Sequence, residues 1–178
     1  MAKQPPTSYT PMKPVDFIAE YVNPAIAAWA GDTKSKAMAI CAISQIDILA
    51  EVVFERLRVD GRAPASSASN YRITLAAKAP AIGWTSDAHD AHKHGWLKEH
   101  SRQFSGGVVQ MNTAGTAFFA DDGFADIGFL GDTDTSLRRN DGSLVSIADV
   151  IGQTTAAWDA EFAGLGLPPW PTQVVRPG

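Results

Sequence analysis

The fold is decided by residues 34–59, which read KSKAMAICAISQIDILAEVVFERLRV. Apolar residues recur here at spacings of three and four, namely Ala39, Ile43, Ile46, Ala50, Val53 and Leu57, with Ile40 and Phe54 beside them. That spacing puts them on one face of an α-helix. At about 1.5 Å per residue, the helix would be close to 40 Å long before Asp60-Gly61 ends it. We therefore expect it to be the central helix of a bundle.

Further helices are predicted on both sides of this stretch. Before it, a helix is expected from Pro14 to about Gly31, with apolar residues at helical spacing. Pro24 lies inside this helix and cannot donate a hydrogen bond to Glu20, so a kink is expected there. After it, residues 61–70 have the composition of a loop.

Three shorter helices complete the predicted helical set. One is expected over residues 71–79, ended by Pro80, and the next from Thr85 or Ser86 up to Gly95. A last helix follows Ser146, where Ser146 and Asp149 form a variant capping box. Its apolar face is expected to be formed by Ile147, Ile151, Thr154, Trp158 and Phe162.

Residues 104–146 have a different pattern and are predicted to form a glycine-rich β-hairpin subdomain. Strands are expected over 106–112 and 116–119, and Asn140-Asp141-Gly142 is a strong turn signal. The predicted fold class is therefore mainly α (α+β), a bundle of three or four helices with this hairpin insertion. A single domain is expected over residues 14–165, with a flexible arm over 1–13 and a Pro-rich tail over 166–178.

Composition excludes several classes of protein. The 178 residues carry 15 Lys and Arg against 19 Asp and Glu, a net charge of -4, which argues against nucleic-acid binding. A lone cysteine, Cys41, excludes an intramolecular disulfide and a Cys-based zinc site, and its place between apolar residues predicts a small core residue. Asp47 and Glu51 interrupt the central apolar stretch, which argues against a membrane span. With no signal peptide pattern, a cytoplasmic location is expected.

The histidines suggest a polar site. All four, His89, His92, His94 and His100, fall within twelve residues. If residues 86–94 are helical, Asp87, Asp90 and His94 lie on one face because they are three and seven residues apart.

One interpretation of this pattern is a divalent metal site. Carboxylates and an imidazole at such spacing bind Zn, Fe or Mn when a second helix adds ligands. The central helix carries two carboxylates four residues apart. The alternative metal ligand set is Asp47, Glu51, Asp87, Asp90 and His94.

The favoured interpretation is structural and needs no cofactor. Asp47 borders apolar residues of the central helix, where a carboxylate requires a partner. Lys93 or His94 is the expected partner, and the pair would fix how the two helices dock. His89, His92 and His100 would then be solvated.

The segment Asp87-Ala-His-Asp90-Ala-His-Lys93-His94-Gly95 resembles a pattern found in uncharacterised small bacterial and phage-borne proteins. In these, a long helix precedes an Asp-x-x-(Asn/Asp)-Ala-x-Lys-His stretch, and a glycine-rich hairpin and a Trp-containing helix follow. The resemblance covers roughly residues 15–165 and implies no activity. Helical HEPN-type ribonucleases have an Arg followed by four to six residues and then a His, and this chain has no such pair.

These observations predict a small intracellular accessory protein of a bacterium or phage. It would act without catalysis, by binding an unknown protein partner or by self-association. The alternative is a metal-dependent or HEPN-like hydrolase or nuclease that uses the Asp/His cluster.

Overall fold

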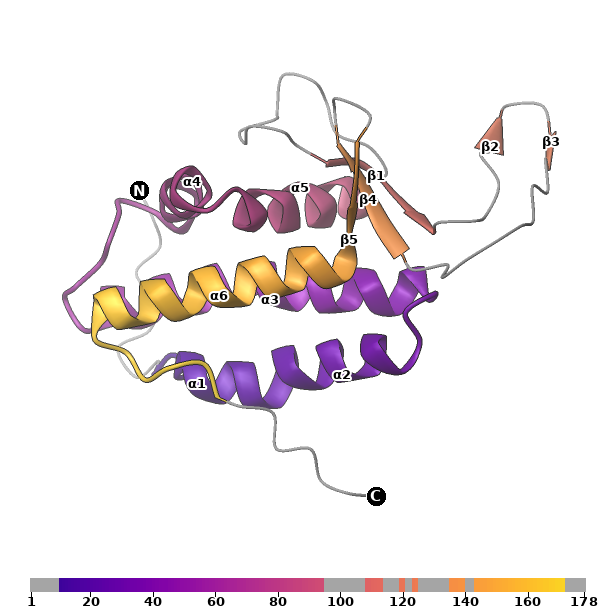
Figure 1. Ribbon diagram of the computed structural model, residues 1–178. Helices are drawn as coiled ribbons and strands as arrows, with labels where there is room; N and C mark the ends of the chain where they lie inside the picture. Colours follow the sequence, from indigo (N-terminus) through magenta and orange to yellow (C-terminus); the bar gives the residue numbers. More distant parts are fainter. Residues whose placement is uncertain are drawn as a thin grey trace.

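The fold was analysed in a computed structural model, which describes residues 10–94, 108–113, 119–120, 123–124, 135–139 and 143–171. The chain is mainly helical, with small antiparallel sheets beside the helices, as the sequence predicts. Figure 1 shows helices stacked side by side with the larger sheet at one end. Residues 1–9 of the predicted arm and 172–178 of the predicted tail lie outside the described residues.

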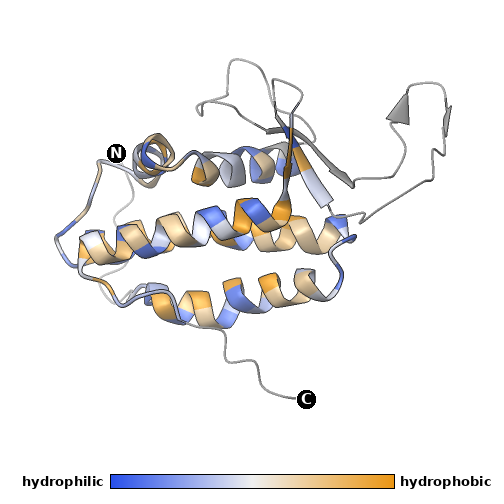
Figure 2. Ribbon diagram, viewed as in Figure 1, coloured by the Kyte–Doolittle hydropathy of each residue, from blue (hydrophilic) through white to orange (hydrophobic). Residues whose placement is uncertain are grey.

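The central helix, α3, spans Lys36–Val59 and packs against α2, α4 and α5. Its N-terminus is capped by Ser35, whose side chain accepts a hydrogen bond from the backbone N–H of Met38. The predicted apolar stripe is confirmed: Ala39, Ile43, Ile46, Ala50, Val53 and Leu57 are all fully buried or nearly so. Figure 2 shows apolar and polar residues alternating along the helices, as amphipathic packing requires. A left-handed glycine, Gly61, follows the helix, where φ is +71°.

The first helical stretch is continuous but changes its winding before Pro24. It consists of α1 (Pro14–Phe17), a π-helical turn η1 (Ile18–Val22) and α2 (Asn23–Gly31). The backbone N–H of Asn23 bonds to the carbonyl of Ile18, five residues back. This wider turn accommodates the missing donor of Pro24, where the sequence predicted a kink.

Two helices begin earlier than predicted. The helix α4 spans Ala68–Lys78, because Ser67 caps it by accepting a hydrogen bond from the N–H of Asn70 at 3.1 Å. The loop prediction for residues 61–70 was therefore wrong over its last three residues.

The helix α5 spans Pro80–His94 and does not begin at Thr85 or Ser86 as predicted. Pro80 is its first residue, where a missing N–H costs nothing. Thr85 is instead buried inside the helix, and its hydroxyl donates to the carbonyl of Ile82 at 2.7 Å. This local bond makes Thr85 compatible with a helix interior.

The last helix, α6, spans Ile147–Leu165 and carries much of the core. Ser146 caps it as predicted, accepting from the N–H of Asp149 at 3.0 Å, while its hydroxyl donates to the Asp149 carboxylate. The predicted apolar face is confirmed, since Ile147, Ile151, Thr154, Trp158 and Phe162 are all buried. Trp158 packs edge-on against Tyr71 of α4, which joins α6 to the rest of the bundle.

The larger sheet pairs different strands from those predicted. It has the order β1 (Val108–Thr113), β4 (Thr135–Arg139), β5 (Leu144–Ser146), all antiparallel. A separate pair is formed by β2 (Phe119–Ala120) and β3 (Gly123–Phe124).

The predicted partner of the 106–112 strand, residues 116–119, was therefore wrong, because β1 pairs with β4. The turn at Asn140-Asp141-Gly142 lies outside the described residues. The strands on either side of it pair, which confirms a hairpin at that place.

Cys41 is exposed, so the prediction that it is a core residue was wrong. It lies on the side of α3 opposite the buried stripe.

By length and composition α3 could also cross a membrane, but half of its most apolar stretch is buried inside the structure. A central bundle helix has the same properties, so α3 gives only weak support to a membrane span.

The importance of the α3 core can be tested with two isoleucines. Ile46 on α3 is 1% exposed and Ile73 on α4 is 39% exposed. We expect Ile46→Ala to lower the free energy of unfolding by about 3 kcal/mol, because it leaves a cavity in the core. Ile73→Ala should change it by less than about 1 kcal/mol. Urea unfolding followed by circular dichroism gives both values, and equal losses would contradict the assigned core.

Candidate functional site

A buried carboxylate on α3 is the centre of a polar cluster that joins three helices. Asp47 is 7% exposed, and side chains from α4 and α5 converge on it. The Ser86 hydroxyl donates to Oδ1 of Asp47, and Nδ1 of His89 lies 2.9 Å from Oδ2. Nε of Arg72 lies 3.3 Å from Oδ1. The cluster is therefore defined as Asp47, Arg72, Ser86 and His89.

Arg72 also connects the cluster to a second carboxylate. Its Nη2 lies 3.1 Å from Oε1 of Glu51, four residues along α3 from Asp47. The guanidinium thus already provides a positive charge to the two carboxylates that were the proposed metal ligands of α3. Within the described ranges, no three His, Cys, Asp or Glu side chains are grouped so that they could hold a metal ion.

The predicted residues of α5 do not share one environment. Asp87 is buried at 3% exposure, whereas Asp90 and Lys93 are exposed. The backbone of His94 ends α5, and its side chain lies outside the described residues. Of the six candidate site residues, the structure brings two to the cluster. Asp47 belongs to it, and Glu51 is joined to it by the salt bridge with Arg72.

The prediction that Lys93 is the partner of Asp47 was wrong, and the side chain of His94, the predicted alternative, lies outside the described residues. Both Asp47 oxygens are engaged by Ser86, His89 and Arg72, while Lys93 is exposed one turn beyond His89. The prediction that His89 is solvated was also wrong, since its side chain is 23% exposed. Ser86 and His89 are three residues apart, so they lie on one face of α5, next to Asp47. A salt bridge from Lys93 would have to reach back over a full turn.

Sequence reasoning therefore missed Arg72, Ser86 and His89. A signal for two of them existed: if α5 begins at Pro80, then Ile82, Ser86 and His89 follow at spacings of four and three. Ile82 is buried, so this row identifies the inward face. Arg72 had no such signal, because its position depends on how α4 crosses α3.

The cluster shifts two pKa values in opposite directions. Burial raises the pKa of Asp47, but the hydrogen bond with His89, the charge of Arg72 and the Ser86 hydroxyl together bring it below its ordinary value. The hydrogen bond to Asp47 raises the pKa of His89, and partial burial of the ring opposes this only in part. The charge of Asp90 raises the His89 pKa further, and that of Lys93 lowers it.

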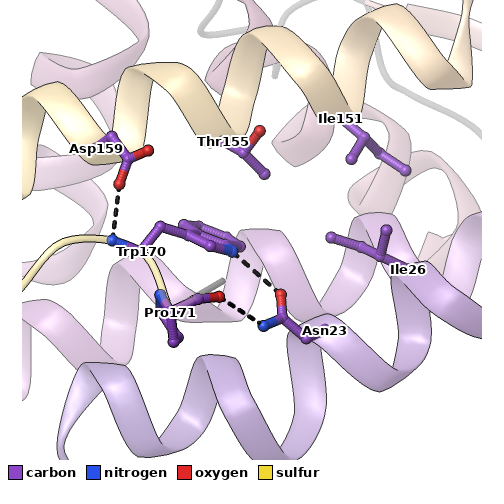
Figure 3. Close-up of a pocket in the computed structure, with 7 residues that line it drawn as sticks. All are labelled: Asn23, Ile26, Ile151, Thr155, Asp159, Trp170 and Pro171. Atoms are coloured by element: carbon purple, nitrogen blue, oxygen red, sulfur yellow. Dashed lines mark hydrogen bonds between the residues drawn. The ribbon is translucent and has the colours of Figure 1, made fainter. Parts of the chain in front are cut away.

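A second feature lies between α2 and α6, where the chain after α6 returns along the bundle. Gly166 ends α6 with φ at +66°, and the chain then brings Trp170 to Asn23 of α2. The indole N–H donates to Oδ1 of Asn23 at 3.1 Å, and Nδ2 of Asn23 donates to the carbonyl of Pro171 at 3.0 Å. The backbone N–H of Trp170 donates to Oδ1 of Asp159 at 2.7 Å. Figure 3 shows these three bonds beside a cavity of about 330 Å³.

Comparison of the chain with known protein families, with curated proteins and with solved structures finds no match. The proposals that follow therefore rest on the geometry of this chain.

The structural weight of Asp47 can be separated from that of Glu51, its neighbour on α3. Asp47→Ala leaves Arg72 and His89 without their buried partner, and we expect the free energy of unfolding to fall by roughly 3 kcal/mol. Glu51 is 55% exposed, so Glu51→Ala should cost less than about 1 kcal/mol. Chemical unfolding at neutral pH measures both. A loss for Glu51→Ala equal to that for Asp47→Ala would show that burial of the carboxylate is not the cause.

The opposite pKa shifts predict the pH dependence of this stabilisation. The pKa of His89 is raised above 6.5, so its contribution is complete below that value and is lost as pH rises through the raised pKa. The pKa of Asp47 is lowered below 3.8, so its contribution is lost only as pH falls through that lower pKa. The pair should therefore stabilise the fold most between these limits.

We expect the stability difference between the native chain and His89→Asn to shrink as pH rises from about 6 to about 9. His92 is exposed three residues further along α5, so His92→Asn is the matched control and should show no comparable change. Urea midpoints across this range measure the effect. A difference that grows with pH would contradict the assigned contact between His89 and Asp47.

Proposed function

We propose that this chain is a binding protein without catalysis, acting as an accessory protein inside a bacterial or phage-infected cell. The observation that supports this best is the use of Asp47, whose two oxygens are both bonded within the protein. A carboxylate that holds α3, α4 and α5 together is a structural joint. This role would account for the two α3 carboxylates that suggested chemistry, Asp47 and Glu51, without a substrate.

The joint would keep the surfaces of the bundle in a fixed arrangement. Buried charged groups are known to fix orientation and register in some proteins more than they add net stability. Arg72 and His89 come from different helices, so their common partner sets the position of α4 and α5 on α3. A rigid bundle of this kind suits recognition, because preformed surfaces lose little entropy on binding. The partner would be another protein or a second copy of this chain.

One contact favours the competing function, a hydrolase or nuclease. An imidazole whose Nδ1 is held by a buried carboxylate is the arrangement that orients a general acid or base, with Nε2 left for the substrate. His89 meets this condition through Asp47. The metal-dependent version is supported less, because Arg72 already pairs with Asp47 and Glu51.

His89→Asn distinguishes the two functions. An asparagine Nδ2 occupies nearly the place of the imidazole Nδ1, so the variant keeps a donor toward Asp47 but cannot transfer protons. We expect neither the native chain nor the variant to hydrolyse RNA or bis(p-nitrophenyl) phosphate, with or without added Mn²⁺ or Zn²⁺. Turnover by the native chain that is lost in folded His89→Asn would overturn the proposal.

Sedimentation velocity over a wide concentration range then identifies the kind of partner. Reversible association that is equal in the native chain and His89→Asn would assign the surface to a second copy. A monomer at every concentration would assign it to a different molecule. Association that is lost only in the variant would contradict a purely structural role for His89. Circular dichroism of both proteins confirms that each is folded.

A further inference from the structure

We propose that the cavity between α2 and α6 binds a small organic ammonium ion with an alkyl tail. This inference rests on the proposed binding function and names a ligand class for it. At about 330 Å³ the cavity is at the lower end of the size range of small-molecule sites. It is built by α2, by α6 and by the segment that returns after Gly166.

The cavity has one polar end and one apolar end. Asp159 and Trp170 lie together at one end, and Ile26 and Ile151 face each other at the other, as Figure 3 shows. A ligand that fills it should therefore have a charged head and a short apolar tail. An alkyl chain of a few carbons against the two isoleucines would bury apolar surface on both sides.

The charge of the head follows from the residues that line the cavity. Asp159 is the single ionisable side chain among its described lining residues, and it is a carboxylate. Trp170 also lines the cavity, and an indole attracts cations over its face because the face carries partial negative charge. A ligand with a negative charge would be repelled by the same groups. The net charge of -4 adds attraction for cations at longer range.

The charged hydrogen-bonding group of the cavity is an acceptor. Asn23 uses its oxygen for the Trp170 indole and one of its two amide N–H groups for the Pro171 carbonyl. Thr155 donates its hydroxyl to the carbonyl of Gly152 on its own helix. Asp159 uses Oδ1 for the N–H of Trp170, and within the described part of the chain Oδ2 has no hydrogen-bond partner. An ammonium group, which donates and does not accept, is complementary to that free oxygen.

The site is held in shape before any ligand arrives. Trp170 is bonded through its backbone to α6 and through its indole to α2, so both ends of the residue are fixed. Asn23 is 8% exposed, which limits competition of water for its two bonds, whereas the bond between Trp170 and Asp159 is exposed. Trp170 therefore needs little ordering on binding, and this favours affinity for a small ligand.

The test uses n-hexylammonium, with hexan-1-ol and hexanoate as neutral and anionic analogues of equal length. Titration calorimetry of the full chain at neutral pH should give a dissociation constant of about 1 mM or tighter for the ammonium ion. Hexan-1-ol should bind at least about tenfold more weakly, which corresponds to about 1.4 kcal/mol, and hexanoate should not bind measurably.

Asp159→Asn is the decisive variant because it removes the charge and keeps an oxygen for the N–H of Trp170. It should weaken hexylammonium binding by about tenfold or more and leave hexan-1-ol unchanged. Asp90→Asn, which makes the same change on α5 away from the cavity, should leave both ligands unchanged. Trp170→Leu, checked for folding by circular dichroism, should also weaken the ammonium ion.

The proposal is overturned if the native chain does not bind hexylammonium, if hexan-1-ol binds as tightly, or if Asp159→Asn binds as the native chain does. None of these results would alter the conclusion on catalysis, which depends on the His89→Asn comparison. Conversely, turnover that requires His89 would overturn the proposed function and leave the ammonium site to be judged by calorimetry.

Discussion

The structure depends on one constraint: the negative charge of Asp47 is buried on the central helix, against which α2, α4 and α5 pack. A carboxylate at 7% exposure is tolerable only if its lost hydration is replaced. Here a hydroxyl, an imidazole and a guanidinium replace it, and they come from two different helices. The need of this one carboxylate for partners therefore fixes the relative positions of α3, α4 and α5. Apolar packing alone would fix these positions less specifically.

The same arrangement explains why residue types that are common in active sites can also gather where no reaction is catalysed. Histidine, aspartate, serine and arginine gather wherever a buried charge must be satisfied, as well as in active sites. What separates the two cases is whether a group is left over for a substrate. In this cluster the guanidinium bridges Asp47 and Glu51, and the imidazole of His89 bonds to Asp47 through Nδ1. Among the described residues, its Nε2 has no such bond.

Sequence periodicity predicted the fold class and most helices because the apolar stripes of α3 and α6 are long and regular. It failed where the signal was short or non-local. The predicted start of α5 was wrong because Thr85 resembles a cap but bonds within the helix. As a result, His94 was predicted to face Asp47 in place of His89.

The predicted strand pairing was wrong for a related reason. The strand β1 pairs with β4 across more than twenty intervening residues, and short strands carry no information about distant partners. Asp47 was identified from its apolar neighbours, whereas Arg72 depends on helix crossing.

The bonds between Asn23 and the Trp170-Pro171 segment join parts of the chain that are 147 and 148 residues apart. The earliest helices therefore cannot make these contacts until nearly the whole described chain has been synthesised. Until then, Asn23 of α2 remains bonded to water, although it is buried in the finished fold. The bundle therefore closes on this side only after Trp170 and Pro171 have left the exit tunnel.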